Sequence, residues 1–301
     1  MHSDRDPPSR RVPEIPPPGE RIRVVIDSDA KNEVDDQWAI ALAILAPERF
    51  QIEGFVGANF DHGLGTQSVA ASVDEIQTVL DKAGMAGRWP VLPGSHPMRY
   101  RNEPSPSAGV DFIVEQAMAS SAEDPLWVVG LGAATDIASA YLVEPRIVDR
   151  VVVFWHFRTR WPVQCYNFNV FGDVHAARLV YHSPLSFVLF DTGTYLRVSP
   201  QESERRVAPH GALGRYLHHI RLSKPWYTDP KKGFYDLGDI AALLDPDLAC
   251  WEATPCPEVG PDLAYRFTNK LGSILRCYHV DRDRTFGLLY DRLARAAAAS
   301  A

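Results

Sequence analysis

Four aspartates lie within ten residues near the start of the chain: Asp27, Asp29, Asp35 and Asp36. Carboxylates that are this close repel one another and destabilise a fold unless a cation or protons neutralise them. Their hard oxygen atoms favour Ca²⁺ or Mg²⁺ over zinc. The spacing therefore predicts a metal site. A simpler interpretation is a solvated acidic turn in which Asp35 caps the next helix, since aspartate is favourable there anyway.

Other polar residues that could join such a site lie far along the chain. Asp236 precedes an apolar helical run, where it could cap that helix or extend the acidic site. Asn167 and Asn169 could hydrogen-bond neighbouring hydroxyls of a sugar, but asparagine before a helix is also ordinary turn chemistry. Asn59, after the second expected strand, is a further candidate for substrate binding.

The elements that must position these residues alternate between strands and helices. Residues 24–26 are β-branched and predict a short buried strand, and the apolar run 38–46 predicts a helix. Further strands are expected at 50–58, 90–94, 126–131, 151–154 and 185–190, with helices at 69–83, 110–119 and 135–142. Alternating strands with continuous apolar runs indicate an α/β fold with an open, mostly parallel, Rossmann-like sheet and helices on both faces. The acidic loop then falls at the carboxyl end of a strand, where such sheets bind ligands.

Length and composition restrict the remaining possibilities. Residues 21–301 are expected to form one domain, and the six prolines of residues 1–20 predict a disordered tail. The net charge of -7 argues against a nucleic-acid partner. No apolar span is long enough for a membrane helix. The four cysteines lack metal or redox spacing and fit reduced thiols in a cytoplasmic protein.

Several segments resemble, in the same order, those of the nucleoside hydrolases, the inosine–uridine-preferring N-ribohydrolases. They are residues 26–40, 129–138, 142–151, 166–177 and the pair Tyr235-Asp236. The likeness runs from about Arg21 to Ala296. It implies the nucleoside hydrolase fold, a homodimer or homotetramer, and hydrolysis of the N-glycosidic bond of a ribonucleoside or related ribosyl compound, which releases ribose and a base.

Carried over by position, the resemblance implies a Ca²⁺ site. Asp29, Asp36 and Asp236 would bind the ion through their side chains, together with the backbone carbonyl of Leu131. Asp29 would also be the general base for a water that the metal activates. The resemblance further implies that Asp35, Asn169 and Asn167 bind the ribose.

The leaving-base end of the site departs from the family pattern. Tyr235 stands where many members have a histidine that protonates the base, and its ordinary pKa of about 10 makes it a weaker acid. The bulky residues 154–158 replace a glycine-rich stretch, and Asn167 replaces a glutamate. His156 is either a histidine packed beside aromatic residues or, like Tyr235, a candidate leaving-group acid. The identity of the base stays open.

Two alternatives remain at this point. The first is a non-catalytic family member that binds a ribosyl compound and retains the metal. The second is a Mg²⁺-dependent phosphatase of the haloacid-dehalogenase type, in which Asp27 would be a covalent nucleophile. The adjacent Asp35 and Asp36 and the segment 142–151 argue against the phosphatase.

Overall fold

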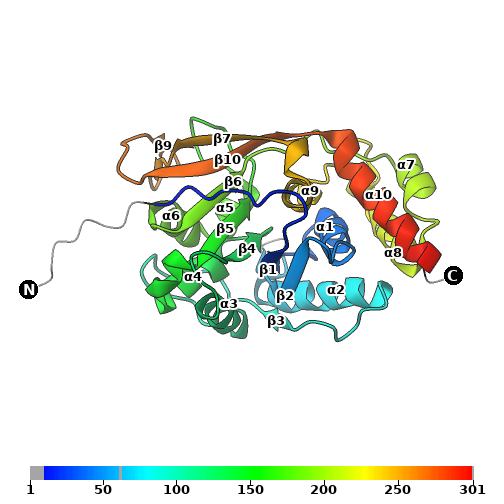
Figure 1. The fold of residues 1–301 in the computed structure, drawn as a ribbon, viewed down its shortest axis with the longest axis horizontal. Coiled ribbons are helices and arrows are strands. Elements are labelled where there is room, and N and C mark those ends of the chain that lie inside the picture. Colours follow the sequence, from blue (N-terminus) through cyan, green and yellow to red (C-terminus); the bar gives the residue numbers. More distant parts are fainter. Residues whose placement is uncertain (1–9, 61–62, 300–301) are drawn as a thin grey trace, which may run out of the picture.

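The computed structural model describes residues 10–60 and 63–299, which are built on an eight-stranded sheet in the order β3-β2-β1-β4-β5-β6-β10-β7 (Figure 1). The strands are Ile22–Ser28 (β1), Phe50–Gly57 (β2), Val91–Pro93 (β3), Leu126–Gly130 (β4), Val151–His156 (β5), Ser186–Phe190 (β6), Ala249–Pro255 (β7) and Ser273–Val280 (β10). Neighbouring strands are parallel except for β7, which runs antiparallel to β10 at one edge. The mostly parallel sheet is confirmed.

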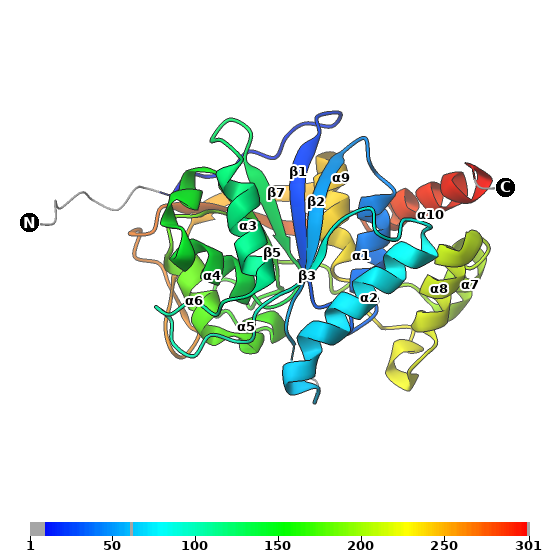
Figure 2. The ribbon, with the colours of Figure 1, turned by 90° about the horizontal axis from the view of Figure 1, so that it is seen from below.

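The helices cover the two faces of this sheet. One face carries Asp35–Ile44 (α1), Ser68–Lys82 (α2), Gly211–Arg221 (α8), Leu237–Leu244 (α9) and Arg282–Ala299 (α10), and the other carries Ala108–Met118 (α3), Thr135–Val143 (α4) and Val174–His182 (α6). Figure 2 shows these two groups on opposite sides of the strands. None of the described helices is long and apolar enough to cross a membrane.

Alternation along the central strands explains the two-sided core. Val24 and Ile26 of β1 join one hydrophobic cluster, whereas Val25 joins the other. In β5, Phe154 and Val153 divide between the clusters in the same way. Successive side chains of a strand point to opposite faces, so a strand covered on both sides must be apolar throughout.

The shorter elements complete the chain. They are the helices Phe168–Gly172 (α5) and Pro200–Arg206 (α7), the single-turn or short 3₁₀ segments Gly65–Gln67, Pro145–Asp149, Pro225–Tyr227 and Pro246–Leu248, and the two-stranded pair Glu258–Val259 (β8) and Tyr265–Arg266 (β9). The sequence patterns did not predict the strands β7 and β10 or the helix α10. Both strands mix exposed and buried positions, so they lack the continuous apolar run of the central strands.

Residues 10–20 differ from the disordered tail that we expected for residues 1–20, while residues 1–9 lie outside the described residues. Arg10 is buried, and its guanidinium donates hydrogen bonds to the carbonyls of Val180 (3.0 Å) and Tyr181 (2.7 Å). Arg49 is also buried and donates to the carbonyl of Pro16 at 2.6 Å. These two arginines satisfy carbonyls of segments that are distant in sequence, and so tie the proline-rich stretch to the sheet domain.

The strand order places the acidic loop at a particular point of the sheet. Successive strands progress outward from β1 in both directions, so the chain reverses its winding between β1 and β4. Ligands of open α/β sheets bind outside the carboxyl ends of the strands at such a reversal. The loop from Ser28 to Asp35 leaves β1 at that end and leads into α1.

Candidate active site

A cavity of about 360 Å³ opens at the carboxyl ends of β1, β4 and β5. Every predicted site residue except Asn59 and Asp27 lines it, including the backbone position Leu131. Asn59 is buried elsewhere and donates its amide hydrogens to the carbonyl of Ser95 and the hydroxyl of Thr135, both at 2.9 Å. It supports neighbouring loops, and the structure does not bring it together with the other candidates.

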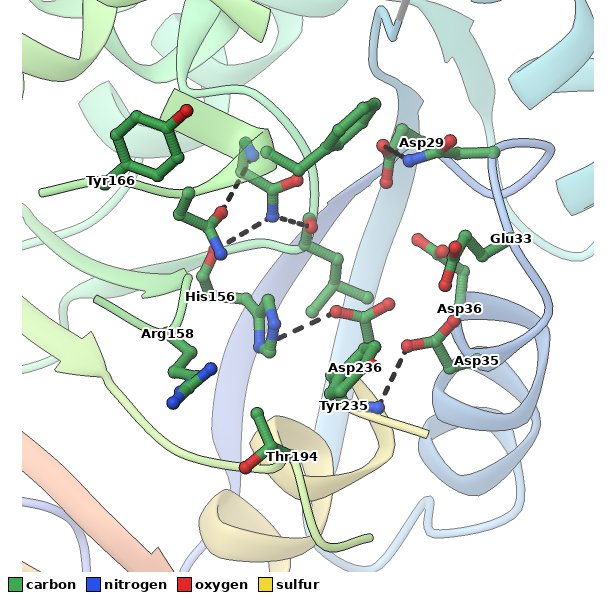
Figure 3. A pocket seen from close by; sticks show the side chains of 15 residues that line it. Asp29, Glu33, Asp35, Asp36, His156, Arg158, Tyr166, Thr194, Tyr235 and Asp236 are labelled. Atoms are coloured by element: carbon green, nitrogen blue, oxygen red, sulfur yellow. Dashed lines mark hydrogen bonds and ion pairs between the residues drawn. The ribbon is translucent and has the colours of Figure 1, made fainter. Parts of the chain in front are cut away.

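Three buried carboxylates form the centre of the cavity. Asp35 and Asp36 occupy the first turn of α1, and Asp236 immediately precedes α9. One oxygen atom from each lies within 4.8 Å of the others (Figure 3). The side chain of Asp35 does not cap α1, whose N-cap residue is Val34, and Asp35 is only 2% exposed. The solvated acidic turn is therefore the wrong interpretation.

The same region raises the pKa of its carboxyl groups. Burial, and then the charge of Asp35, raise the pKa of Asp36 to about 6. Burial, followed by the charges of Asp36 and Asp35, raises the pKa of Asp236 well above its ordinary range. Ionised carboxylates held this close in a dry site are unfavourable, so their hard oxygen donors fit a divalent cation that would offset the repulsion.

Asp29 lies in the cavity but is not one of the three closest carboxylates. Its Oδ2 atom accepts a hydrogen bond from the amide of Asn32 at 2.8 Å. Burial, followed by the charge of Asp36, raises its pKa well above the ordinary range. Asp27, by contrast, is fully buried in β1 and does not line the cavity. This position is incompatible with the nucleophile role that the phosphatase alternative requires.

A lysine that we did not predict holds Asp35. The Nζ atom of Lys232 lies 3.3 Å from Oδ1 of Asp35 and 2.7 Å from Oε2 of Glu33. The backbone N–H of Tyr235 donates to Oδ2 of Asp35 at 2.9 Å. Lys232 lies in a polar stretch without helix or strand periodicity, so no local pattern indicates its role.

His156, at the end of β5, is both packed and directed at the site. Its Nδ1 atom lies 2.7 Å from Oδ2 of Asp239 and 3.6 Å from Oδ1 of Asp236. Burial lowers the pKa of His156, but the charge and hydrogen bond of Asp239, together with the charges of Asp35 and Asp36, outweigh burial, so the net shift is upward. From the sequence, Asp239 gave only a faint likeness to a phosphatase motif, and we did not predict its pairing with His156, although its spacing of three residues from Asp236 places both on one side of α9.

The two asparagines have structural partners. Asn167 is the N-cap residue of α5, and its side chain accepts a hydrogen bond from the backbone N–H of Asn169 at 2.8 Å, which confirms the turn chemistry. The amide of Asn169 donates to the carbonyls of Leu131 (2.6 Å) and His156 (2.9 Å). Asn169 therefore joins the carboxyl ends of β4 and β5 at the cavity wall.

Solved structures of similar shape share this fold at low sequence identity. A plant nucleoside hydrolase is 18% identical with a TM-score of 0.70. A purine-preferring ribonucleoside hydrolase from Gardnerella vaginalis is also 18% identical, with a TM-score of 0.71. Each comparison covers 91% of this chain and 99% of the other chain. The crystallised effector protein XOO4466 is 16% identical with a TM-score of 0.66, over 93% of this chain and 95% of its own.

Family membership follows from the sequence over most of its length. No curated protein matches the chain at a significant level. The family model described as inosine-uridine preferring nucleoside hydrolase, however, matches residues 24–285, which include the acidic loop, His156 and Asp236. This match favours the hydrolase interpretation over the phosphatase, in agreement with the buried position of Asp27. The chain belongs to the inosine-uridine preferring nucleoside hydrolase family, whose members are glycosidases that act on N-glycosidic bonds.

Proposed function

We propose that the protein hydrolyses the N-glycosidic bond of a ribosyl compound in a Ca²⁺-dependent reaction. The observation that carries this proposal is the set of buried, mutually repelling carboxylates in one cavity with His156, in a chain of this family. Asp36 and Asp236 would hold the ion together with Asp29 and the carbonyl of Leu131. When bound, Ca²⁺ would supply the positive charge that binds sugar hydroxyls and makes a water more acidic.

Asp29 is our candidate for the general base. Asn32 engages Oδ2 of Asp29, which leaves Oδ1 to accept a proton from the attacking water. Cleavage of the bond to the base develops positive charge on the sugar, as in related glycosyl transfers. The carboxylates of Asp35 and Asp29 line the cavity, where their negative charge would stabilise that transition state.

His156 is the better of the two candidates for the leaving-group acid. Asp239 binds Nδ1 of His156, so Nε2 is available to give a proton to the departing base. Burial raises the pKa of Tyr235, the other candidate, and makes its hydroxyl a still weaker acid. The ring centroids of His156 and Tyr235 are 6.4 Å apart, so both side chains belong to the same part of the cavity.

The test is a panel of ribonucleosides incubated with the protein, with and without a chelator, followed by an assay for free ribose. We expect ribose release that the chelator abolishes and Ca²⁺ restores, and Asp36→Ala should lack both turnover and Ca²⁺ binding. Ca²⁺ and ligand binding in calorimetry without any product would instead support the non-catalytic alternative. A homodimer or homotetramer and a cytoplasmic location remain predictions.

A further inference from the structure

The walls of the cavity carry opposite charges. Asp29, Asp35 and Asp36, from the loop after β1 and the start of α1, lie on one side (Figure 3). Arg158 lies on the other side with His156 and Thr194. Among the described residues that line the cavity, Arg158 is the one lysine or arginine. A ligand that spans the cavity therefore meets carboxylates at one end and a guanidinium at the other.

The guanidinium of Arg158 has no protein partner in the described part of the chain. Arg158 is exposed and lines the cavity, and no carboxylate of residues 10–60 and 63–299 lies within ion-pair distance of its guanidinium. Nearby arginines are engaged: Arg276 pairs with Asp191 at 2.6 Å, and the guanidinium of Arg160 lies 4.9 Å from the ring centre of Tyr166. Arg158 thus presents a permanent charge and five N–H donors that the fold does not use.

Charge balance within the cavity does not account for Arg158. Lys232 already compensates Asp35 and Glu33 at 3.3 and 2.7 Å. The remaining carboxylates, Asp29, Asp36 and Asp236, would surround the proposed cation. An arginine that only neutralised these acids would be expected to pair with one of them, and Arg158 does not.

We propose that the substrate is a ribosyl compound with an anionic group, a phosphate or a carboxylate, that Arg158 binds. This inference rests on the proposed function, because it assumes that the ribose occupies the acidic side of the cavity. Guanidinium groups bind both anions through two parallel N–H···O bonds. The hydroxyl of Thr194, which lines the same side of the cavity, adds a further hydrogen-bond donor.

The anionic group is attached either to the sugar or to the base, and two matched pairs of substrates distinguish these positions. Inosine and inosine 5′-monophosphate differ by a phosphate on the sugar, whereas uridine and orotidine differ by a carboxylate on the base. We would measure kcat/KM for all four with Ca²⁺, in the wild type, Arg158→Gln and Arg158→Lys. Arg215→Gln is the control, because Arg215 is exposed on α8 and does not line the cavity.

We expect one anionic compound to exceed its neutral partner by tenfold or more, and Arg158→Gln to remove that advantage, in line with the strength of charge-assisted hydrogen bonds. Arg158→Lys should retain part of it, and Arg215→Gln all of it. Equal rates within both pairs, or an equal effect of Arg158→Gln on all four substrates, would overturn the inference. If none of the four compounds is hydrolysed, the proposed function fails. Calorimetry of the same compounds then tests Arg158 separately. Anion-selective binding that Arg158→Gln abolishes supports the role of Arg158, and the absence of anion-selective binding contradicts that role.

Discussion

The substitution Asp36→Asn tests two properties of the acidic site: how much it destabilises the metal-free protein, and whether it binds Ca²⁺. Asparagine has nearly the same shape as aspartate and can still accept the 2.6 Å hydrogen bond from Ser28, but it removes one charge from the buried group. We expect the metal-free variant to be more stable than the metal-free wild type at neutral pH. The variant should also lose the stabilisation that Ca²⁺ gives the wild type.

The magnitude follows from the pKa of Asp36. The rise from the ordinary 3.8 to about 6 corresponds to about 3 kcal/mol, since one pKa unit is about 1.36 kcal/mol. The folded protein holds this proton more tightly than the unfolded chain. Metal-free stability therefore falls as the pH rises between about 4 and 6, and the full cost is present at pH 7.5. For a chain of this length, that cost corresponds to roughly 5 °C in melting temperature.

The assay is thermal unfolding of the wild type and Asp36→Asn at pH 7.5 and pH 4.5, with chelator or with Ca²⁺. With chelator, the variant should melt higher at pH 7.5, and the difference should shrink at pH 4.5. Asp74→Asn is the matched control, because Asp74 is exposed on α2. Equal melting temperatures of the two metal-free proteins at pH 7.5, or an equal effect of Ca²⁺ on both, would refute the reasoning.

Three further substitutions test other parts of the structure. Lys232→Met leaves Asp35 and Glu33 without their buried cation, so we expect a loss of about 3 kcal/mol in urea unfolding and a kcat/KM reduced by tenfold or more; unchanged stability would contradict the ion pairs. Asp239→Asn removes the charge that raises the pKa of His156 most, so the high-pH limb of the kcat profile should move to lower pH, and an unmoved limb would argue against His156 as the acid. Arg10→Met should lower the free energy of unfolding by about 2 kcal/mol, because carbonyls of residues 180 and 181 lose their buried donor. Its kcat should stay at the wild-type value, since Arg10 does not line the cavity; a large fall in kcat would place Arg10 in the site after all.

The sequence by itself determined the parts of this protein that depend on local pattern. Short runs rich in β-branched and apolar residues predicted β1, β2, β4, β5 and β6, because strands covered on both faces need apolar side chains on both sides. Asp29, Asp35 and Asp36 lie between the end of β1 and the first turn of α1, so their place at the carboxyl end of the sheet was predictable from order along the chain. The order of the motifs indicated the family, which the match over residues 24–285 confirms.

Only the tertiary structure decided which side chains meet. Lys232 pairs with Asp35 across 197 residues, and His156 pairs with Asp239 across 83 residues. No periodic pattern in the sequence predicts either pair. The role of Arg10 in holding the proline-rich segment could be recognised only in the structure, where its carbonyl partners, residues 180 and 181, lie in α6. Hydrogen bonds and ion pairs have a range of a few ångströms. Partners brought that close by packing can lie anywhere along the chain, so charge and spacing predicted an acidic site but not its counter-charges.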